Sequence, residues 1–119
     1  MSTIERKQTG PLMSKIVIHN GTVYLSGIVP SPDAEGKDIT TQTNSVLEQI
    51  DALLQEAGTD KSRLLTATIW LSDIENDLST MNGIWETWLD PNGIPTRATV
   101  EAKLARPTVN VEIQVTAAL

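Results

Sequence analysis

Arg97 and Glu112, both near the C-terminus, are the charged side chains best suited to chemistry on a small acid. An arginine guanidinium binds a carboxylate through two parallel hydrogen bonds and so holds it in a fixed orientation. A nearby glutamate can take a proton from water and pass it to a leaving amine, which is general acid–base catalysis. A cross-strand ion pair within a sheet is the commoner role for two such residues. The two charges alone therefore leave a structural and a catalytic interpretation open.

Other kinds of catalytic or binding site find little support in the sequence. His19 is the single histidine and directly precedes an Asn-Gly pair, so we interpret it as a turn residue and not as part of a Ser-His-Asp triad. Cysteine is absent, which excludes disulfides, thiolate catalysis and zinc–thiolate sites. The glycines follow neither a phosphate-loop nor a dinucleotide-binding pattern. We therefore expect no metal ion and neither a phosphate-loop nor a dinucleotide site.

The length and charge of the chain limit its class. With 119 residues, no low-complexity linker and no internal repeat, we expect a single domain over residues 1–119. The formal net charge of −6 and the scattered basic residues argue against non-specific binding of nucleic acid. No segment approaches the roughly 20 apolar residues that span a bilayer, and the N-terminus lacks the apolar run of a signal peptide. We expect a soluble cytoplasmic protein without a membrane partner.

Residues 95–118 contain the pattern that must position Arg97 and Glu112. Apolar and polar residues alternate in both halves of this stretch, which is typical of strands with one buried face. Pro107 separates the two strands because proline cannot donate to a strand ladder. The apolar face holds Ala98, Val100, Ala102, Leu104, Val109, Val111, Ile113 and Val115. The other face holds Arg97, Thr99, Glu101, Lys103, Asn110, Glu112, Gln114 and Thr116. We therefore expect Arg97 and Glu112 on the same face, one strand apart.

The first part of the chain predicts strands and a long helix. An edge strand is expected over residues 3–9, and two strands flank Asn20-Gly21, a strong signal for a hairpin with a type I′ turn. Apolar residues at helical spacing then predict a helix from Thr40 to Ala57, which Asp38 or Thr40 can cap and which ends before Gly58. Its apolar stripe consists of Val46, Leu47, Ile50, Leu53, Leu54 and Ala57.

The middle of the chain predicts one more strand and one more helix. Residues 64–71 alternate, with Leu65, Ala67, Ile69 and Leu71 on one face. A helix is expected from about Leu78 to Leu89, with Asp77 as its cap. Its inner stripe is Leu78, Met81, Trp85, Trp88 and Leu89. The order β-β-β-α-β-α-β-β predicts an α+β domain with a mixed sheet and both helices on one of its faces.

The sheet face away from the helices is expected to form a subunit interface. Besides its charged residues it carries Tyr24, Ser26, Thr66, Thr68, Trp70, Thr99 and Thr116. Such a face is too aromatic and too rich in threonine for plain solvent exposure, yet too polar for a core. Interfaces combine polar rims with aromatic anchors, so we favour an interface over a solvated face.

From about Gly10 to the end, the order and spacing of several short motifs resemble the RidA/YjgF family of small imine deaminases. The motifs are Gly10-Pro11, Leu25-Ser26-Gly27, residues 67–74, Met81-Asn82, residues 95–102 and Val111-Glu112-Ile113. The chain is most similar to a branch that keeps the arginine but differs from the best-known RidA proteins. The resemblance implies a chorismate-mutase-like α+β fold. It also implies a homotrimer with a central barrel of sheets and active sites between neighbouring subunits.

The resemblance further implies a reaction and the residues that perform it. Arg97 would hold the substrate carboxylate, and Glu112 would position and activate the attacking water. The cleft would be lined by Ser26, Gly27 and Thr99, with Asn82 nearby. The expected reaction is hydrolysis of a 2-imino or enamine acid, such as 2-aminoacrylate, to the 2-keto acid and ammonia, without a cofactor. Such reactive intermediates escape from pyridoxal-phosphate enzymes, so the expected role is control of metabolite damage.

Three residues depart from the best-studied branch of the family, and two other functions stay open. Leu12 replaces a tyrosine, Ile28 a glutamine and Thr99 a cysteine, which changes the cleft wall and hence the substrate range. One alternative is a non-enzymatic member of the same fold, either a small-metabolite-binding or a chaperone-like protein. The other is an endoribonuclease or translation inhibitor, as proposed for some members. The acidic balance and the lack of a histidine pair argue against this last function.

Overall fold

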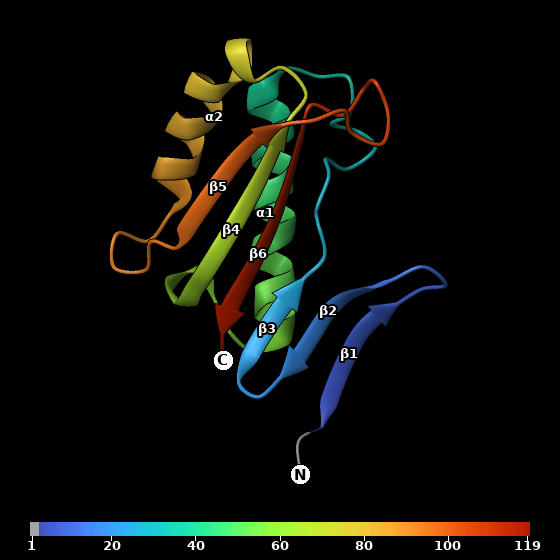
Figure 1. Ribbon diagram of the computed structural model, residues 1–119, viewed down its shortest axis with the longest axis vertical. Coiled ribbons are helices and arrows are strands. Elements are labelled where there is room, and N and C mark those ends of the chain that lie inside the picture. The colour runs from blue at the N-terminus through green and yellow to red at the C-terminus, as the bar shows by residue number, and fades with distance from the viewer. Residues whose placement is uncertain (1–2) are drawn as a thin grey trace.

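A computed structural model of the chain describes residues 3–119, which form one mixed six-stranded sheet with two α-helices (Figure 1). The elements are β1 (Ile4–Thr9), β2 (Ser14–His19), β3 (Thr22–Leu25), α1 (Ile39–Ala57), the 3₁₀ helix η1 (Lys61–Arg63), β4 (Leu64–Leu71), α2 (Ile74–Trp88), β5 (Thr96–Glu101) and β6 (Val111–Ala118). In the sheet the strand order is β1-β2-β3-β6-β4-β5. β4 and β5 are parallel, and the other neighbouring strands are antiparallel. The predicted element order and the α+β class are confirmed.

The N-terminal strands form as predicted. Asn20 and Gly21, between β2 and β3, have φ angles of 49° and 76°, the positive values that both central residues of a type I′ turn require. β1 is an edge strand that pairs only with β2 among the described residues. His19 ends β2 opposite Thr22, so its predicted place beside the turn is confirmed.

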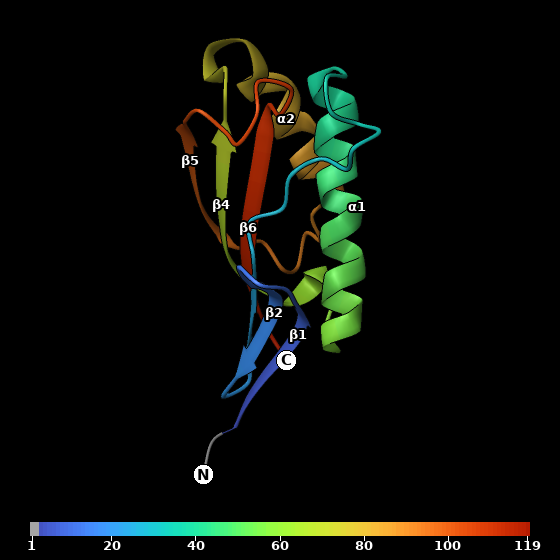
Figure 2. The ribbon, with the colours of Figure 1, turned by 90° about the vertical axis from the view of Figure 1, so that its right-hand side faces the viewer.

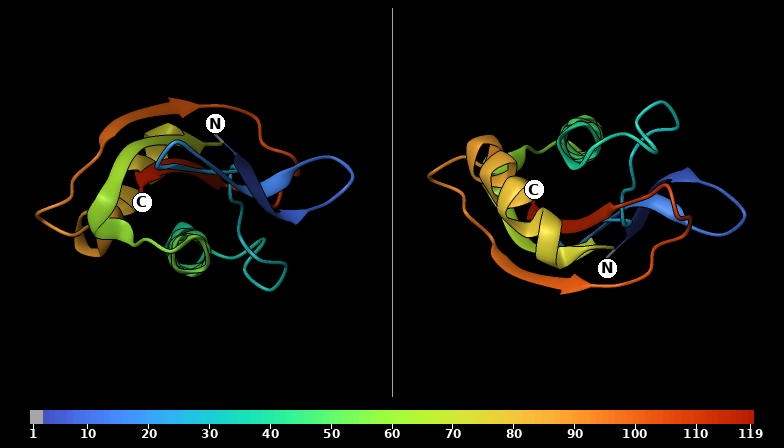
Figure 3. Two further views of the ribbon diagram at one scale, coloured as in Figure 1. Left: turned by 90° about the horizontal axis from the view of Figure 1, so that it is seen from below. Right: turned by 90° about the horizontal axis from the view of Figure 1, so that it is seen from above.

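Both helices lie on the same side of the sheet, which leaves the other side uncovered within residues 3–119 (Figures 2 and 3). All six residues of the predicted apolar stripe of α1 are buried. On α2, Met81 and Trp85 are buried, and Leu78, Trp88 and Leu89 pack against the core while partly exposed. No helix in this part of the chain has the length and apolar character needed to cross a membrane. We call the side of the sheet away from the helices the uncovered face.

The helix ends match the predictions for α1 but not for α2. Asp38 caps α1 by accepting a hydrogen bond from the Thr41 amide at 2.9 Å, and Gly58 follows the helix with a φ of 93°. α2 begins at Ile74, four residues before the predicted start, with Asp73 as its cap. Asp77, the predicted cap, lies in the first turn, where partial burial and then the negative charge of Asp73 raise its pKa. The prediction fails because the first turn is largely polar and lacks the apolar spacing that signals a helix.

A β-bulge changes which residue of β4 is buried. The register against β6 shifts between Leu64 and Thr66, so that Leu64 turns into the core and Leu65 is 44% exposed. Ala67, Ile69 and Leu71 are buried as predicted. The prediction that Leu65 lies on the core face is therefore wrong. A prediction from regular alternation assumes that no strand contains an extra residue, and a β-bulge breaks this assumption.

The two faces of β5 are the reverse of the prediction. Arg97, Thr99 and Glu101 pair in register with Ala67, Ile69 and Leu71 of β4, which face the helices. Side chains that pair in register project to the same face, so Arg97, Thr99 and Glu101 also lie on the helix side. The alternate residues Ala98 and Val100 lie on the uncovered face, where Val100 is 44% exposed. Alternation shows which residues of an edge strand share a face, but not which face points inward.

A buried polar network fixes the start of β6. The fully buried Gln42 of α1 shares its two amide N–H groups among Lys37 O, Thr108 O and Asn110 Oδ1, and its amide oxygen accepts a hydrogen bond from the Asn110 backbone at 2.8 Å. Asn110 also donates to Ser72 Oγ at 2.8 Å. Buried polar groups satisfied in this way specify a single arrangement. The network therefore holds the strand that carries Glu112.

Candidate active site

Arg97 is held in place without being neutralised. Its Nη1 donates a hydrogen bond to Asn82 Oδ1 of α2 at 2.8 Å. Within residues 3–119 no carboxylate lies within ion-pair distance of its guanidinium, since the ion pairs found there join Lys7 to Glu5 and Arg106 to Glu35. A guanidinium has five N–H donors, of which Asn82 occupies one. The exposed remainder of the group is available to a ligand carboxylate.

Thr99 and Ser26 have buried hydroxyl oxygens without hydrogen-bond partners. In the described part of the chain three buried side-chain polar atoms lack a partner, and Thr99 Oγ1 and Ser26 Oγ are two of them. Orphaned buried polar groups are uncommon in folded proteins and call for a specific explanation. Both residues belong to the predicted site, and a polar ligand would give each hydroxyl a partner.

Glu112 lies directly against the backbone of Gly27. A Cβ added to Gly27 would overlap Glu112 Oε2 and lie 3.1 Å from its Cδ, so the carboxylate occupies space that only glycine leaves open. The segment is irregular, because Tyr24 pairs with Thr116 while Ile28 pairs with Ile113. Ile28 lies four residues after Tyr24, whereas Ile113 lies three residues before Thr116. The segment between Tyr24 and Ile28 therefore contains one residue more than the part of β6 opposite it. Such bulges redirect side chains and are frequent beside active sites.

Glu112 and Arg97 lie on opposite faces of the sheet. Glu112 pairs with Trp70 of β4, which pairs with Val100 of β5, so all three side chains are on the uncovered face. β4 lies between β5 and β6, whereas the sequence predicts them as neighbours. Placing Arg97 and Glu112 on one face, one strand apart, is therefore wrong. A second neighbour in a sheet is roughly 10 Å away, and here the sheet itself also intervenes.

The structure thus gathers the predicted site residues into two separate groups. We call Arg97, Asn82 and Thr99 the arginine group, which lies between β5 and α2. We call Glu112, Gly27 and Ser26 the glutamate group, which lies between β6 and the segment after β3. A small acid bound by Arg97 cannot reach Glu112 of the same chain. No three His, Cys, Asp or Glu side chains in residues 3–119 are arranged to hold a metal ion.

Comparisons with known proteins agree on one family. Residues 5–119 match the family model described as Endoribonuclease L-PSP. A RutC family protein from Haemophilus ducreyi is 45% identical over 106 residues, covering 89% of this chain and 88% of the relative. The chain belongs to the RidA/YjgF family. A second relative, the RutC family protein YoaB from Escherichia coli K12, is 42% identical over 117 residues, covering 98% of this chain and 99% of the relative.

The fold of the RidA/YjgF family is also seen in a similar solved structure. The crystal structure of a YjgF protein family member from Neisseria meningitidis is 43% identical, with a TM-score of 0.90 over 98% of this chain and 94% of that chain. The chorismate-mutase-like fold that the resemblance implies is therefore confirmed.

Sequence reasoning missed two features of the site in this RidA/YjgF protein. One is the Arg97–Asn82 hydrogen bond, which makes Asn82 a contact of the arginine. The spacing of residues on α2 could have indicated this contact. Asn82 follows Ile74 and Leu78 at the same interval of four residues, so it lies on the same side of the helix. The other is the irregular Leu25–Gly27 segment, for which the Ser26-Gly27 pair at a strand end is the only sequence signal.

Proposed function

We propose that the protein hydrolyses reactive 2-imino and enamine acids to 2-keto acids and ammonia, in sites that two copies of the chain build together. The observation that carries the proposal is the division of the site residues. The Arg97 guanidinium lies on one face of the sheet, where it contacts Asn82 and has no carboxylate partner in residues 3–119. The Glu112 carboxylate lies on the other face, against the backbone of Gly27. Each group supplies what the other lacks, so a second copy can complete the site. Membership of the RidA/YjgF family supports the same function.

The proposed reaction needs only water and the two groups. Arg97 of one copy binds the substrate carboxylate through parallel hydrogen bonds, which orients the imine carbon. Glu112 of the next copy takes a proton from water as the water oxygen bonds to that carbon, and the C=N electron pair moves to nitrogen. Glu112 then returns a proton to the nitrogen. In the resulting carbinolamine, Glu112 carries the hydroxyl proton to the nitrogen, the C=O bond forms as the C–N bond breaks, and ammonia leaves. An enamine first takes up a proton at carbon and loses one from nitrogen, which converts it to the imine.

Freshly generated 2-aminoacrylate gives the direct test of an enzyme against a binding protein. An enzyme releases pyruvate and ammonia faster than the uncatalysed reaction in buffer. A non-enzymatic small-metabolite-binding or chaperone-like protein on the same fold would bind the keto acid without accelerating this release. Equal rates with and without protein would therefore overturn the proposed activity.

The proposed assembly is a homotrimer in which other copies cover the uncovered face. Tyr24 is 46% exposed on that face, next to the Thr66–Thr116 hydroxyl pair at 2.6 Å, and Trp70 lies farther along β4 on the same face. We predict a particle of about 39 kDa, three times the 12.9 kDa chain. Light scattering at micromolar concentration measures this mass. A stable monomer would contradict the prediction and would leave each site without its second half.

A nuclease function has weaker support. The description of the matching family carries the word endoribonuclease. The chain has one histidine, which lies at the end of β2 and outside both groups, and a net charge of −6. RNA binding depends mainly on lysine and arginine neutralising phosphates. We therefore propose a small imino or keto acid as the ligand, and no nucleic acid.

Removing the support of Arg97 is expected to weaken substrate binding. In Asn82→Ala the Arg97 guanidinium loses its 2.8 Å hydrogen bond, so the Arg97 side chain has more rotamer freedom in the free protein. Substrate binding must then remove this additional freedom, which costs free energy. We expect KM to rise about tenfold with a smaller change in kcat, as for a lost hydrogen bond to a charged group. Asn82→Asp would place a competing carboxylate beside Arg97, so its KM should rise further. Unchanged KM in both variants would contradict this positioning role for Asn82.

A further inference from the structure

A shallow hollow of about 560 Å³, open to solvent, lies on the surface of α2 and reaches Asn82 of the arginine group. It is lined by Ile74, Glu75, Leu78, Ser79 and Asn82. Asn82 is also the residue that accepts the hydrogen bond from Arg97. One end of the hollow is therefore formed by a residue in direct contact with Arg97, the group that binds the substrate carboxylate in the proposed function.

The floor of the hollow is apolar. Ile74 and Leu78 are partly buried and pack against the hydrophobic core, so they form a fixed surface. Ile74, Leu78 and Asn82 follow one another at intervals of four residues, which places them along one side of the helix. From Asn82 to Ile74 the helix rises roughly 12 Å. This length exceeds the methyl group of an alanine-derived substrate and suits a side chain of several carbons.

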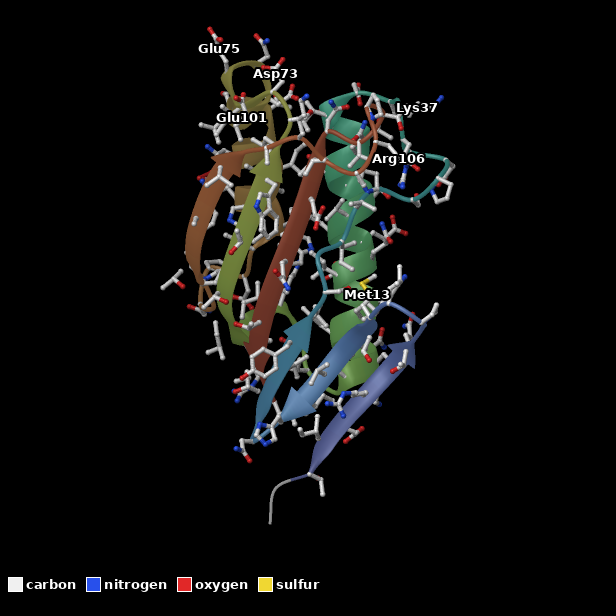
Figure 4. All side chains as sticks on the ribbon, turned by 45° about the vertical axis from the view of Figure 1, so that its right-hand side comes forward. Met13, Lys37, Asp73, Glu75, Glu101 and Arg106 are labelled. Atoms are coloured by element: carbon white, nitrogen blue, oxygen red, sulfur yellow. The ribbon has the colours of Figure 1, made fainter. Side chains whose placement is uncertain are left out.

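The far end of the hollow is acidic. Glu75 lines it, and Figure 4 shows Asp73 and Glu101 near Glu75 at the N-terminal end of α2. Glu101 also accepts a hydrogen bond from the Ile74 amide at 3.1 Å, which fixes one of these carboxylates at the helix start. A negatively charged side chain extending from Arg97 along this helix would meet like charges, which is unfavourable.

We propose that this hollow receives the substrate side chain, so that the protein prefers 2-imino acids with extended, uncharged side chains. Imines of the size derived from leucine or methionine are favoured over the alanine-sized imine, and imines with acidic side chains are disfavoured. This substrate class rests on the proposed function, because Arg97 must hold the carboxylate for the side chain to enter the hollow.

Narrowing the hollow tests the proposal. Imines are generated in place from alanine, leucine and glutamate by an amino-acid oxidase, and their hydrolysis is followed. The unmodified protein should give the highest kcat/KM with the leucine-derived imine and the lowest with the glutamate-derived one. Ser79→Phe, at an exposed position on the wall, should lower kcat/KM for the leucine-derived imine about tenfold. The alanine-derived imine should change less than about twofold, because its methyl group does not extend along the helix.

Thr80→Phe is the matched control. Thr80 is the exposed neighbour on the same helix and does not line the hollow; it lines a second groove with Ile84, Thr87 and Trp88, which Ser79 also borders. This variant should leave kcat/KM for the alanine-derived and the leucine-derived imine unchanged. Equal rates for alanine and leucine imines in the unmodified protein would overturn the proposal, as would equal losses for both substrates in Ser79→Phe or no loss for either.

Failure of the proposed function would give a different result, namely hydrolysis of none of the imines. Titration with two 2-keto acids then still tests the hollow. Tighter binding of 4-methyl-2-oxopentanoate than of pyruvate, lost in Ser79→Phe, supports the proposal. Equal binding of the two keto acids contradicts it.

Discussion

Arg97→Lys is expected to fold and assemble normally but to lose about 10²-fold in kcat/KM for 2-aminoacrylate hydrolysis. A lysine ammonium is a point charge and cannot reproduce the two parallel hydrogen bonds of the guanidinium fork. The same change also alters the contact with Asn82, which fixes the direction of the fork at 2.8 Å. Steady-state kinetics measures the loss, and calorimetry with a 2-keto acid should show weaker binding.

Arg6→Lys is the control for this change, because Arg6 is an exposed arginine on the edge strand β1. It should retain full activity. Near-wild-type turnover in Arg97→Lys, with an unchanged melting temperature, would rule out the carboxylate-binding role of Arg97.

Glu112→Gln is expected to separate binding from hydrolysis. The glutamine keeps the shape of the side chain over Gly27 but cannot accept a proton from water. Keto-acid binding should therefore persist, while kcat falls by about 10²–10⁴-fold, as for a lost general base. If Glu112 only braces the sheet, the change should shift stability by about 1 kcal/mol and leave turnover intact.

Binding, turnover and melting are measured on the same preparation of Glu112→Gln, beside Glu86→Gln at an exposed position of α2. The control should match the unmodified protein in all three. Retained turnover in Glu112→Gln would mean that another group activates the water.

The elements with local signals were predictable from the sequence. The stripe of α1 repeats at helical spacing over 12 residues, and its ends carry an aspartate and a glycine whose cap geometries the structure confirms. The Asn20-Gly21 turn needs only local backbone conformations. Each of these features depends on residues close together in the sequence, and a single sequence contains all of that information.

The arrangement of Arg97 and Glu112 was not predictable in the same way. Alternation identifies the residues that share a face of one strand. Whether that face points toward the helices or away from them depends on the register with the neighbouring strand. For β5 that neighbour is β4, which lies before α2 in the chain, and for β6 the neighbours are β4 and β3, which are also distant in the chain. The apolar alternation of Ala98 and Val100 also misleads, because in β5 it marks the uncovered face.

The contacts of the site residues were beyond sequence reasoning as well. The overlap of Glu112 with the space above Gly27 depends on one extra residue in the Leu25–Gly27 segment. Nothing in the alternation of β3 indicates that residue. Likewise, the Arg97–Asn82 hydrogen bond depends on how α2 lies across β5, which long-range packing decides.

A mixed trimer tests the shared site most directly. Arg97→Lys and Glu112→Gln chains with different affinity tags are produced together, and assemblies that carry both tags are purified. Each homotrimer alone should be nearly inactive. In every mixed trimer, one interface joins an intact Arg97 to an intact Glu112, so we predict about one-third of wild-type activity per trimer. If each chain held its own complete site, no chain in the mixture would be intact, and the mixed assembly would stay as inactive as its parents.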